Sequence, residues 1–247
     1  MEMIKNAEQV PAQAIIMAGG KGTRLLPLTG SMPKPMVPIL DKPVLQLIVS
    51  SLVRAGVTDI AMTLGYMPER IVSYFGNGRR LGAHITYFVE KTPLGTAGGV
   101  KAAEKFIKGT CVVMSGDALT TLSVADMLRS HARRPALCTM AVKKVKDPRG
   151  MGEVEPDGRG GVRAFREKPQ IYKTGIVNMG IYVMEKRILD FIPPGVSDFS
   201  RDVFPAIVNR INLYQTNCYW SDIGTLTSYY RANMHAARRP ELFGLNA

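Results

Sequence analysis

Two aspartates and one glycine-rich segment are the residues of this chain best suited to chemistry on phosphates. Asp117 and Asp222 each follow an apolar run that predicts a β-strand, and residues 18–24 read Ala-Gly-Gly-Lys-Gly-Thr-Arg. Glycines let backbone N–H groups approach a phosphate closely. Carboxylates are the ligands that Mg²⁺ prefers in proteins. The combination predicts a metal-dependent enzyme that acts on a nucleoside triphosphate.

Two cations accompany the glycine-rich segment. Arg24 carries a planar guanidinium that matches phosphate oxygens. Lys34 lies between Pro33 and Pro35, which stiffen the backbone and lower the entropy lost when the lysine is ordered. We expect both cations to meet the triphosphate. The segment lacks the ending of a Walker loop and does not match the dinucleotide fingerprint GxGxxG.

Each of these residues also has an ordinary structural interpretation. The glycine-rich segment could be a tight turn, Asp117 could cap the helix that follows it, and Asp222 could be an acid at a helix start. Glu167 and Lys168 could form a surface ion pair of little energetic weight. Trp220 is more typical of packing than of stacking on a base. The sequence leaves these alternatives open.

The elements that must position these residues alternate between strands and helices. Apolar runs predict strands over residues 12–17, 59–64, 84–89, 111–114, 137–145, 175–184 and 213–219. Helical spacing predicts helices over residues 44–53, 68–75, 96–107, 124–133, 186–192 and 201–210, and a last helix from Thr225. The prolines at positions 27, 33, 35, 38 and 43 predict an extended stretch. Such alternation is typical of an α/β protein with a mainly parallel sheet covered on both faces.

Residues 150–165 interrupt this alternation. Two short β-like runs flank Asp157-Gly158-Arg159-Gly160-Gly161, which is a hairpin signal. We find no linker, repeat or low-complexity tract. The sequence therefore predicts one α/β domain over residues 1–247 with a small β-rich insert.

Composition restricts the class of protein. The 247 residues are 46% hydrophobic and carry a net charge of +12, but the basic residues are scattered and form no stripe that predicts nucleic-acid binding. No apolar run is long enough to cross a membrane, and residues 1–11 lack a signal-peptide core, so we expect a cytoplasmic protein. The three cysteines form no CxxC pair and are expected to be structural thiols, while three scattered histidines disfavour zinc.

A series of motifs in one order resembles the signature of the sugar-1-phosphate nucleotidyltransferase family, and most closely its mannose-1-phosphate guanylyltransferase-like members. The motifs are Gly20-Lys21-Gly22-Thr23-Arg24-Leu25, Pro33-Lys34-Pro35-Met36, Leu94-Gly95-Thr96-Ala97-Gly98, Ser115-Gly116-Asp117, Phe165-Arg166-Glu167-Lys168-Pro169, Asn178-Met179-Gly180-Ile181-Tyr182 and Trp220-Ser221-Asp222-Ile223-Gly224-Thr225. They span nearly the whole chain. Several motifs in register are far more specific than any one of them.

The resemblance implies a Rossmann-like, GT-A-type fold and the reaction of an NTP with a sugar 1-phosphate to give an NDP-sugar and pyrophosphate. It implies that Asp117 and Asp222 hold Mg²⁺, that Arg24 and Lys34 meet the triphosphate, and that Lys168 meets the sugar phosphate. The implied sugar-binding residues are Gly152, Glu167 and Asn178. The implied nucleotide-binding residues are Ala18, Gly19, Gly20, Gly22, Thr23, Gly95, Thr96 and Gly98.

Two departures limit what the resemblance carries over. Many relatives have an acid shortly after the first metal aspartate, where this chain has Thr120 and Thr121. Many also continue into a C-terminal β-helix domain, which we do not expect here, so a homo-oligomer stays open. Segment 94–98 looks most like that of mannose- or heptose-1-phosphate guanylyltransferases, so the resemblance favours GTP and a mannose-like sugar phosphate. The alternatives are glucose 1-phosphate with UTP or dTTP, a non-sugar phosphate acceptor, and a silent regulatory homologue that only binds nucleotide-sugar.

Overall fold

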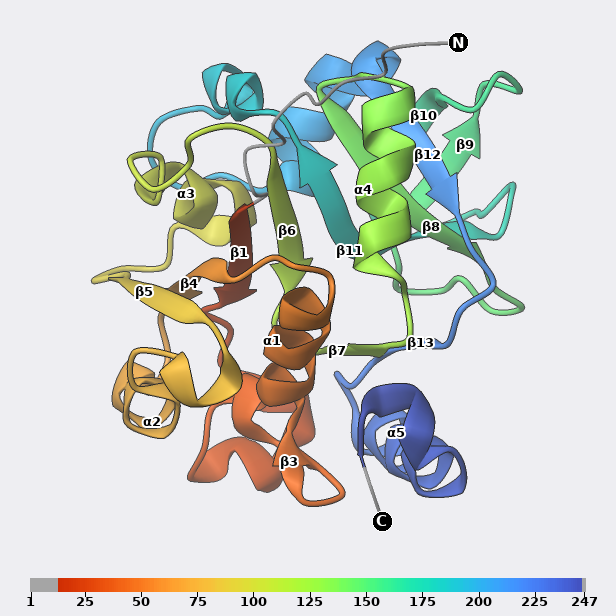
Figure 1. Cartoon of the computed structure of the whole chain (residues 1–247). Helices are drawn as coiled ribbons and strands as arrows, with labels where there is room; N and C mark the ends of the chain where they lie inside the picture. The colour runs from red at the N-terminus through yellow and green to blue at the C-terminus, as the bar shows by residue number, and fades with distance from the viewer. Residues whose placement is uncertain (1–12, 246–247) are drawn as a thin grey trace, which may run out of the picture.

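A nine-stranded sheet forms the centre of the molecule in the computed structural model, which describes residues 13–245 (Figure 1). Its main path runs in the order β10 (Val162–Arg166), β9 (Glu153–Pro156), β11 (Ile176–Met184), β6 (Cys111–Ser115), β1 (Gln13–Ala18), β4 (Asp59–Leu64) and β5 (His84–Val89). A branch from β11 adds β8 (Cys138–Lys144) and then β12 (Ile211–Gln215).

The sheet has a parallel half and an antiparallel half. Strands β5, β4, β1 and β6 pair in parallel, as their fully apolar sequences predict. Strand β11 runs against β6, β8 and β9, and the predicted hairpin of β9 and β10 joins the same sheet through the pair Val177–Glu153. The prediction of an α/β fold with a mostly parallel central sheet is confirmed, and the β-rich insert is an extension of that sheet.

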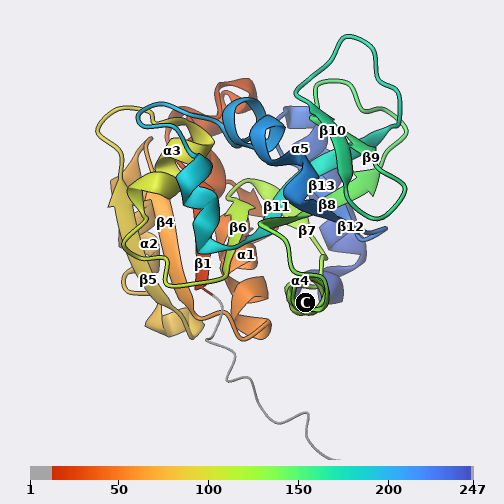
Figure 2. The same cartoon turned by 90° about the horizontal axis from the view of Figure 1, so that it is seen from above.

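Helices cover both faces of the sheet (Figure 2). Helices α1 (Val44–Arg54), α2 (Pro68–Phe75) and α4 (Val124–Arg133) bury one core, while α3 (Gly95–Ala102) and the short helices that follow β11 bury the other. Successive residues of β1 illustrate the alternation, because Ile15 packs into the second core and Ile16 into the first. Each face therefore has its own apolar core.

A separate two-stranded ladder lies between α1 and α5 (Leu226–Arg238), as Figure 1 shows. It pairs β7 (Ala118–Thr120) with β13 (Trp220–Asp222) in antiparallel register. A third apolar cluster, which includes Leu47, Leu119, Ile223 and Ala232, fixes this ladder between the two helices. The ladder matters because both candidate metal ligands lie at its end.

Several predicted bounds are confirmed and others are wrong. The elements at residues 59–64, 68–75, 84–89 and 124–133 have the predicted bounds. The predicted helix over residues 96–107 ends at Ala102. The N–H groups of Ala103, Glu104 and Ile107 donate to carbonyls three residues earlier, as in a 3-10 helix, and these turns keep nearly the apolar spacing of an α-helix. The predicted strand over residues 213–219 ends at Gln215 and β13 begins only at Trp220, since Thr216 accepts a hydrogen bond from the Cys218 N–H in the turn between β12 and β13.

Three further predictions are corrected by the structure. The proline-rich stretch is extended only at its end, in the short strands Pro38–Ile39 and Lys42–Pro43. Before them it forms 3-10 turns at Thr23–Leu25, Leu28–Gly30 and Lys34–Met36, because the φ angle fixed by proline also suits these turns. The predicted helix over residues 201–210 is a π-helix over Phe199–Val203 followed by a 3-10 helix over Phe204–Arg210, since Pro205 has no N–H to continue an α-helix. The predicted helix at residues 186–192 is the 3-10 helix Lys186–Phe191.

The remaining expectations concern thiols and termini. Cys111 and Cys138 are buried and unpaired, which confirms them as structural thiols, and burial raises the pKa of Cys111 to about 12. None of the helices within residues 13–245 combines the length and the apolar character needed to span a membrane. The start of the first strand at Ala12 and the interpretation of residues 1–11 lie outside the described residues.

Candidate active site

The ladder of β7 and β13 brings the two candidate metal ligands together. Asp222 is the last residue of β13 and pairs in register with Ala118, the neighbour of Asp117. The Ile223 N–H also donates to the Asp117 carbonyl oxygen at 3.2 Å. Two carboxylates that are more than a hundred residues apart in sequence therefore lie side by side.

Lys34 lies between these two carboxylates. Its Nζ is 2.6 Å from Asp117 Oδ2 and 2.9 Å from Asp222 Oδ1. The lysine side chain is only 9% exposed, whereas those of the aspartates are 33% and 45% exposed. Burial alone would lower the pKa of Lys34, but the charges and hydrogen bonds of the two aspartates outweigh burial, and the pKa is raised. The lysine is a fixed positive charge.

The glycine-rich segment packs directly against Lys34. Gly22 has a φ of +68°, and a Cβ there would lie 2.7 Å from the Lys34 Cβ. The Thr29 hydroxyl donates to the Gly22 carbonyl at 2.9 Å and closes the turn. Gly22 is thus needed both for its backbone conformation and for the close approach of the segment to the lysine.

The capping roles considered for the two aspartates belong to other residues. Ser123 caps α4 by accepting a hydrogen bond from the Asp126 N–H at 3.2 Å. Thr225 caps α5 and forms a capping box with Ser228. Neither Asp117 nor Asp222 is therefore a helix cap, and their placement beside Lys34 calls for another explanation.

A cleft of about 230 Å³ opens beside this charged group. The predicted site residues that line it are Thr96, Asp117, Gly152, Glu167, Lys168, Asn178 and Asp222. They come from α3, from the β7–β13 ladder and from the antiparallel part of the sheet. The fold thus joins the candidate metal ligands to all the candidate sugar contacts in one cavity.

Lys168 has an unusual backbone at the edge of this cleft. Its φ is +45°, in the left-handed region that residues other than glycine rarely adopt. Its Nζ lies 3.3 Å from Glu167 Oε1. The ion pair considered from the sequence therefore exists, but it lines the cleft instead of a featureless surface. Backbone strain of this kind persists where the surroundings hold it and is frequent at functional sites.

Asn178 and its neighbours form an irregular stretch of β11 that faces the cleft. The register of β11 against β8 shifts between Asn178 and Tyr182. The Asn178 amide donates to the Tyr182 hydroxyl at 2.6 Å, and its Oδ1 accepts from the Gly180 N–H at 3.0 Å. A β-bulge of this kind re-aims side chains. Here it leaves Asn178 and Tyr182 lining the same cavity.

The predicted nucleotide-binding residues are not all brought to this cavity. Ala18, Gly19 and Gly20 lie at the end of β1, and Thr23 and Arg24 are exposed; none of them lines the cleft. Gly95 and Gly98 pack tightly against residues 195–197, where a Cβ would lie 2.4 Å and 2.7 Å from carbonyl oxygens. Close packing of α3 is a sufficient reason for these two glycines.

Sequence reasoning missed several residues of the cleft. Ser115, Met151, Tyr182 and Ser200 also line it. Trp220 lines it as well, and its indole N–H donates to the Met179 carbonyl at 2.9 Å. Trp220 therefore contributes to the wall of the cleft in addition to the predicted packing. Membership of a quoted motif was the available signal for Ser115 and Tyr182, whereas nothing in the sequence singled out Met151 or Ser200.

The donor set suits a divalent cation that is completed by its substrate. Over residues 13–245 no three His, Cys, Asp or Glu side chains gather closely enough to enclose a metal ion. Mg²⁺ commonly uses one or two carboxylates and takes its other ligands from phosphates and water. Asp117 and Asp222 fit that pattern, and the Lys34 ammonium between them shows that a cation is accommodated there.

The fold and cleft define an α/β protein in which two carboxylates and a buried lysine lie beside one cavity. The family model described as nucleotidyl transferase matches residues 13–239, and the chain belongs to this family. The predicted resemblance is therefore confirmed at the level of the family.

Individual relatives agree with this assignment. The chain is 37% identical to a mannose-1-phosphate guanylyltransferase of Mycobacterium tuberculosis over 91% of its own length and 64% of the relative. It is 35% identical to a UTP–glucose-1-phosphate uridylyltransferase of Synechocystis, over 89% of the chain and 62% of the relative. It thus spans less than two thirds of these relatives. The crystal structure of HddC from Yersinia pseudotuberculosis complexed with GMP-PN is 30% identical, with a TM-score of 0.79, covering 91% of this chain and 99% of that one.

Proposed function

We propose that this cleft transfers a nucleotidyl group from an NTP, preferentially GTP, to a mannose-like sugar 1-phosphate, giving an NDP-sugar and pyrophosphate. The observation that carries the proposal is the shared ion pair of Lys34 with Asp117 and Asp222, which opens into the same cavity as Gly152, Lys168 and Asn178. One end of the cavity suits a triphosphate with its cation, and the other suits a phosphorylated sugar.

In the proposed reaction, a phosphate oxygen of the sugar 1-phosphate attacks the α-phosphorus of the NTP. The new P–O bond forms as the bond from the α-phosphorus to the bridging oxygen breaks, and pyrophosphate leaves with that electron pair. Two anions must approach each other, so catalysis depends on screening and positioning, and the chain need not supply a nucleophile. Mg²⁺ held by Asp117 and Asp222 would screen charge on the phosphates.

The chain's own residues divide the remaining tasks. Lys34 has a raised pKa and stays charged at neutral pH, so it can neutralise the triphosphate near the point of attack. Lys168 is exposed at the cleft edge, where it can bind the phosphate of the incoming sugar. Arg24 lies in the exposed glycine-rich segment and would reach the outer phosphates. Glu167 and Asn178 offer an acceptor and an amide for sugar hydroxyls.

A second candidate is transfer from UTP or dTTP to glucose 1-phosphate. The near-equal identity to the guanylyltransferase and the uridylyltransferase, 37% and 35%, favours keeping it. A non-sugar acceptor and a silent homologue are less well supported, because Lys34, Asp117, Lys168 and Asp222 are all present. A homologue that only binds nucleotide-sugar has no need of the complete set.

The deciding experiment is a matrix of the four NTPs against hexose and heptose 1-phosphates, read by pyrophosphate release. We expect turnover with GTP and a mannose-like phosphate. Turnover with UTP or dTTP and glucose 1-phosphate would select the second candidate. Binding without turnover for every combination would favour the silent homologue, and success only with another phosphate monoester would move the acceptor out of the sugar class.

Asp117→Asn tests the site within this reaction. Loss of one contact made in the transition state lowers turnover by about 10²–10³-fold, and we expect at least this loss with a folded protein. Asp190→Asn is the matched control, because Asp190 is an exposed acid outside the cleft. Near-normal pyrophosphate release by Asp117→Asn would refute the assignment of this carboxylate.

A further inference from the structure

Glu153 is a fully buried acid directly beside the cleft. It is the first residue of β9, follows the cleft residue Gly152, and has no exposed surface. A buried carboxylate is costly unless its oxygens are hydrogen-bonded and its charge is paired. The contacts that compensate Glu153 therefore show what it holds in place.

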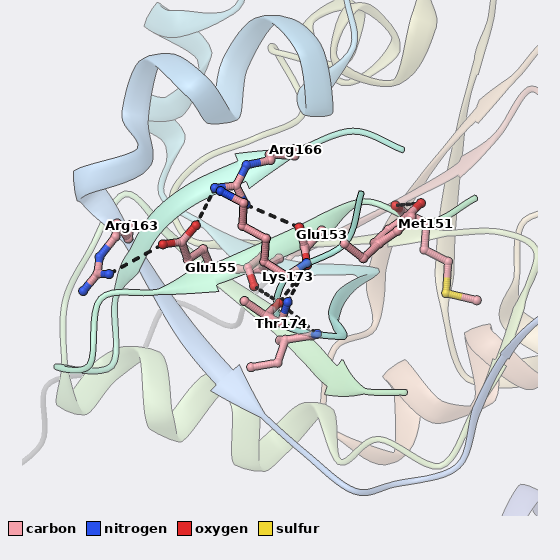
Figure 3. Close-up of polar contacts among 10 residues, drawn as sticks. Met151, Glu153, Glu155, Arg163, Arg166, Lys173 and Thr174 are labelled. Carbon is pink, nitrogen blue, oxygen red and sulfur yellow. Dashed lines mark hydrogen bonds and ion pairs between the residues drawn. The ribbon is translucent and has the colours of Figure 1, made fainter. Parts of the chain in front are cut away.

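One oxygen of Glu153 receives three hydrogen bonds from a single loop. Its Oε1 accepts from the Lys173 N–H at 2.5 Å, the Thr174 N–H at 2.7 Å and the Thr174 hydroxyl at 3.2 Å. Its Oε2 lies 3.3 Å from Arg166 Nη1 (Figure 3). Burial by itself raises the pKa of Glu153, but these donors and the arginine outweigh burial, and the pKa is lowered. The carboxylate is ionised at neutral pH.

These contacts lie at both ends of the loop that carries Lys168. Arg166 stands immediately before Glu167 and Lys168, and Lys173 with Thr174 stands where the loop returns to β11. Figure 3 shows the arginine and the loop amides converging on the one carboxylate from different segments. Glu153 thus fastens the beginning and the end of segment 166–174 to β9. The strained backbone of Lys168 lies inside the fastened segment.

The same strand position fixes the other sugar-side residues. Val177 pairs with Glu153 across β11 and β9, and the Asn178 N–H donates to the Gly152 carbonyl at 2.9 Å. Three segments that contribute Gly152, Lys168 and Asn178 to the cleft therefore meet at Glu153. An acid on the exposed face of a strand with alternating polar and apolar residues would need none of these contacts.

We propose that Glu153 is a positioning residue that sets the affinity of the cleft for the sugar 1-phosphate. The inference rests on the proposed function, because it assigns that substrate to the end of the cavity formed by Gly152, Lys168 and Asn178. Glu153 touches no reacting atom. It acts through the Lys168 loop. A displacement of such a loop by about 1 Å can lower the reaction rate by about 10²-fold. The NTP side, at Lys34 and Asp117, shares none of its contacts.

Glu153→Gln is the sharpest test because it keeps the shape and removes the charge that faces Arg166. The NH₂ group of the new amide would face the arginine donors, so one end of the loop is released. We expect the KM for the sugar phosphate to rise by roughly tenfold, short of the hundredfold that full misplacement can bring. The KM for the NTP should stay within about twofold of the wild-type value, because the residues on the NTP side of the cleft are not displaced.

Glu155→Gln is the matched control. Glu155 lies on the same strand and also pairs with Arg166, but it accepts no hydrogen bond from Lys173 or Thr174. We expect both KM values to match those of the wild type. If Glu153→Gln does not fold at the assay temperature, Arg166→Lys takes its place, since lysine keeps the charge and loses the two-pronged contact. It should shift the same KM in the same direction.

The outcomes separate the two proposals. An inactive wild-type protein across the whole substrate matrix means that the proposed function has failed. With an active wild type, an unchanged sugar-phosphate KM in Glu153→Gln overturns the positioning role. An equal rise of both KM values also overturns it, since a general loss of structure would move both.

Discussion

Two charged clusters of this protein each contain two acids that share a cation, but the clusters differ in what surrounds them. In the first, a single cation, Lys34, is shared by Asp117 and Asp222. In the second, Arg166 is shared by Glu153 and Glu155, and another arginine, Arg163, lies 3.5 Å from Glu155. In the first cluster the buried residue is the cation. In the second cluster the buried residue is one of the two acids.

The difference teaches which cluster can take a ligand. The two aspartates are 33% and 45% exposed and line the cleft, so their carboxylates remain accessible to a further cation. Glu153 is sealed, with three donors on one oxygen and an arginine on the other. Completed hydrogen bonding makes a buried polar group rigid. We infer that the first cluster binds a ligand and that the second one positions the Lys168 loop.

Lys34→Met gives the largest effect that this comparison predicts. Turnover should fall by about 10²–10³-fold, because a charge that acts on the transition state is lost. The two carboxylates would also face each other without a cation. Added Mg²⁺ should therefore raise the Tm of the variant by a few degrees more than that of the wild type, as expected for a ligand bound by the folded state.

Thermal unfolding of both proteins with and without Mg²⁺ measures this difference. Lys91→Met is the control, because Lys91 is an exposed lysine outside the cleft. An equal Mg²⁺ effect on the wild type and on Lys34→Met would show that Lys34 and the divalent ion do not share a site. The distinction between a binding cluster and a sealed one would then be lost.

Arg166→Met tests the second cluster and should lower the stability of the fold as well as raise the KM for the sugar phosphate. It leaves the buried Glu153 carboxylate with loop donors only, and removal of a charged hydrogen-bond partner costs about 1.5–3 kcal/mol. Arg166 is 31% exposed, so solvent screening puts our expectation near the lower end, at about 2 kcal/mol. Urea unfolding of the variant measures the change in free energy of unfolding.

The double variant Glu153→Gln/Arg166→Met checks whether this loss comes from the pair. The two substitutions should cost less together than the sum of their separate effects, because the buried charge and its partner are removed at once. Strict additivity would mean that Arg166 stabilises the fold through Glu155 or through packing. The second cluster would then not be sealed by the Glu153–Arg166 contact.

The comparison also explains how far the sequence could predict the site. Asp117 and Asp222 were found because each follows a strand-like run, but they meet through the antiparallel ladder of β7 and β13, which lies outside the main sheet. Lys34 was expected on the triphosphate, yet it lies between the aspartates. That contact depends on how the 3-10 turns of segment 23–36 pack against the ladder of β7 and β13, which no local pattern records.

Glu153 shows the opposite case, a residue that the sequence conceals. In Gly152-Glu153-Val154-Glu155 the acids alternate with an apolar residue, which is typical of a strand with one exposed face. The prediction of a strand is right, but the alternation does not indicate that Glu153 is fully buried. Its partners lie 13, 20 and 21 residues away, across a hairpin and a loop. Only the folded chain places them together.

The pH dependence of stability gives the smallest effect and the finest distinction between the clusters. The pKa of Glu153 is lower in the folded protein than its ordinary value of 4.5. A carboxylate of this kind contributes stability above its unfolded pKa, and the contribution is lost as the pH falls through the folded pKa. The free energy of unfolding of the wild type should exceed that of Glu153→Gln by about 1–2 kcal/mol at neutral pH, which is the order of magnitude of a lost hydrogen bond to a charged group. Below the ordinary value of 4.5 the gap should shrink.

Urea unfolding at neutral pH and at a series of acidic pH values measures this gap. Other acids titrate in the same range, but they are common to both proteins, so the difference between the two curves isolates Glu153. A gap that stays constant through the acidic range would mean that the carboxylate charge contributes nothing and that shape alone holds the loop. A gap that closes confirms that the charge itself fastens segment 166–174, which is what a positioning role for Glu153 requires.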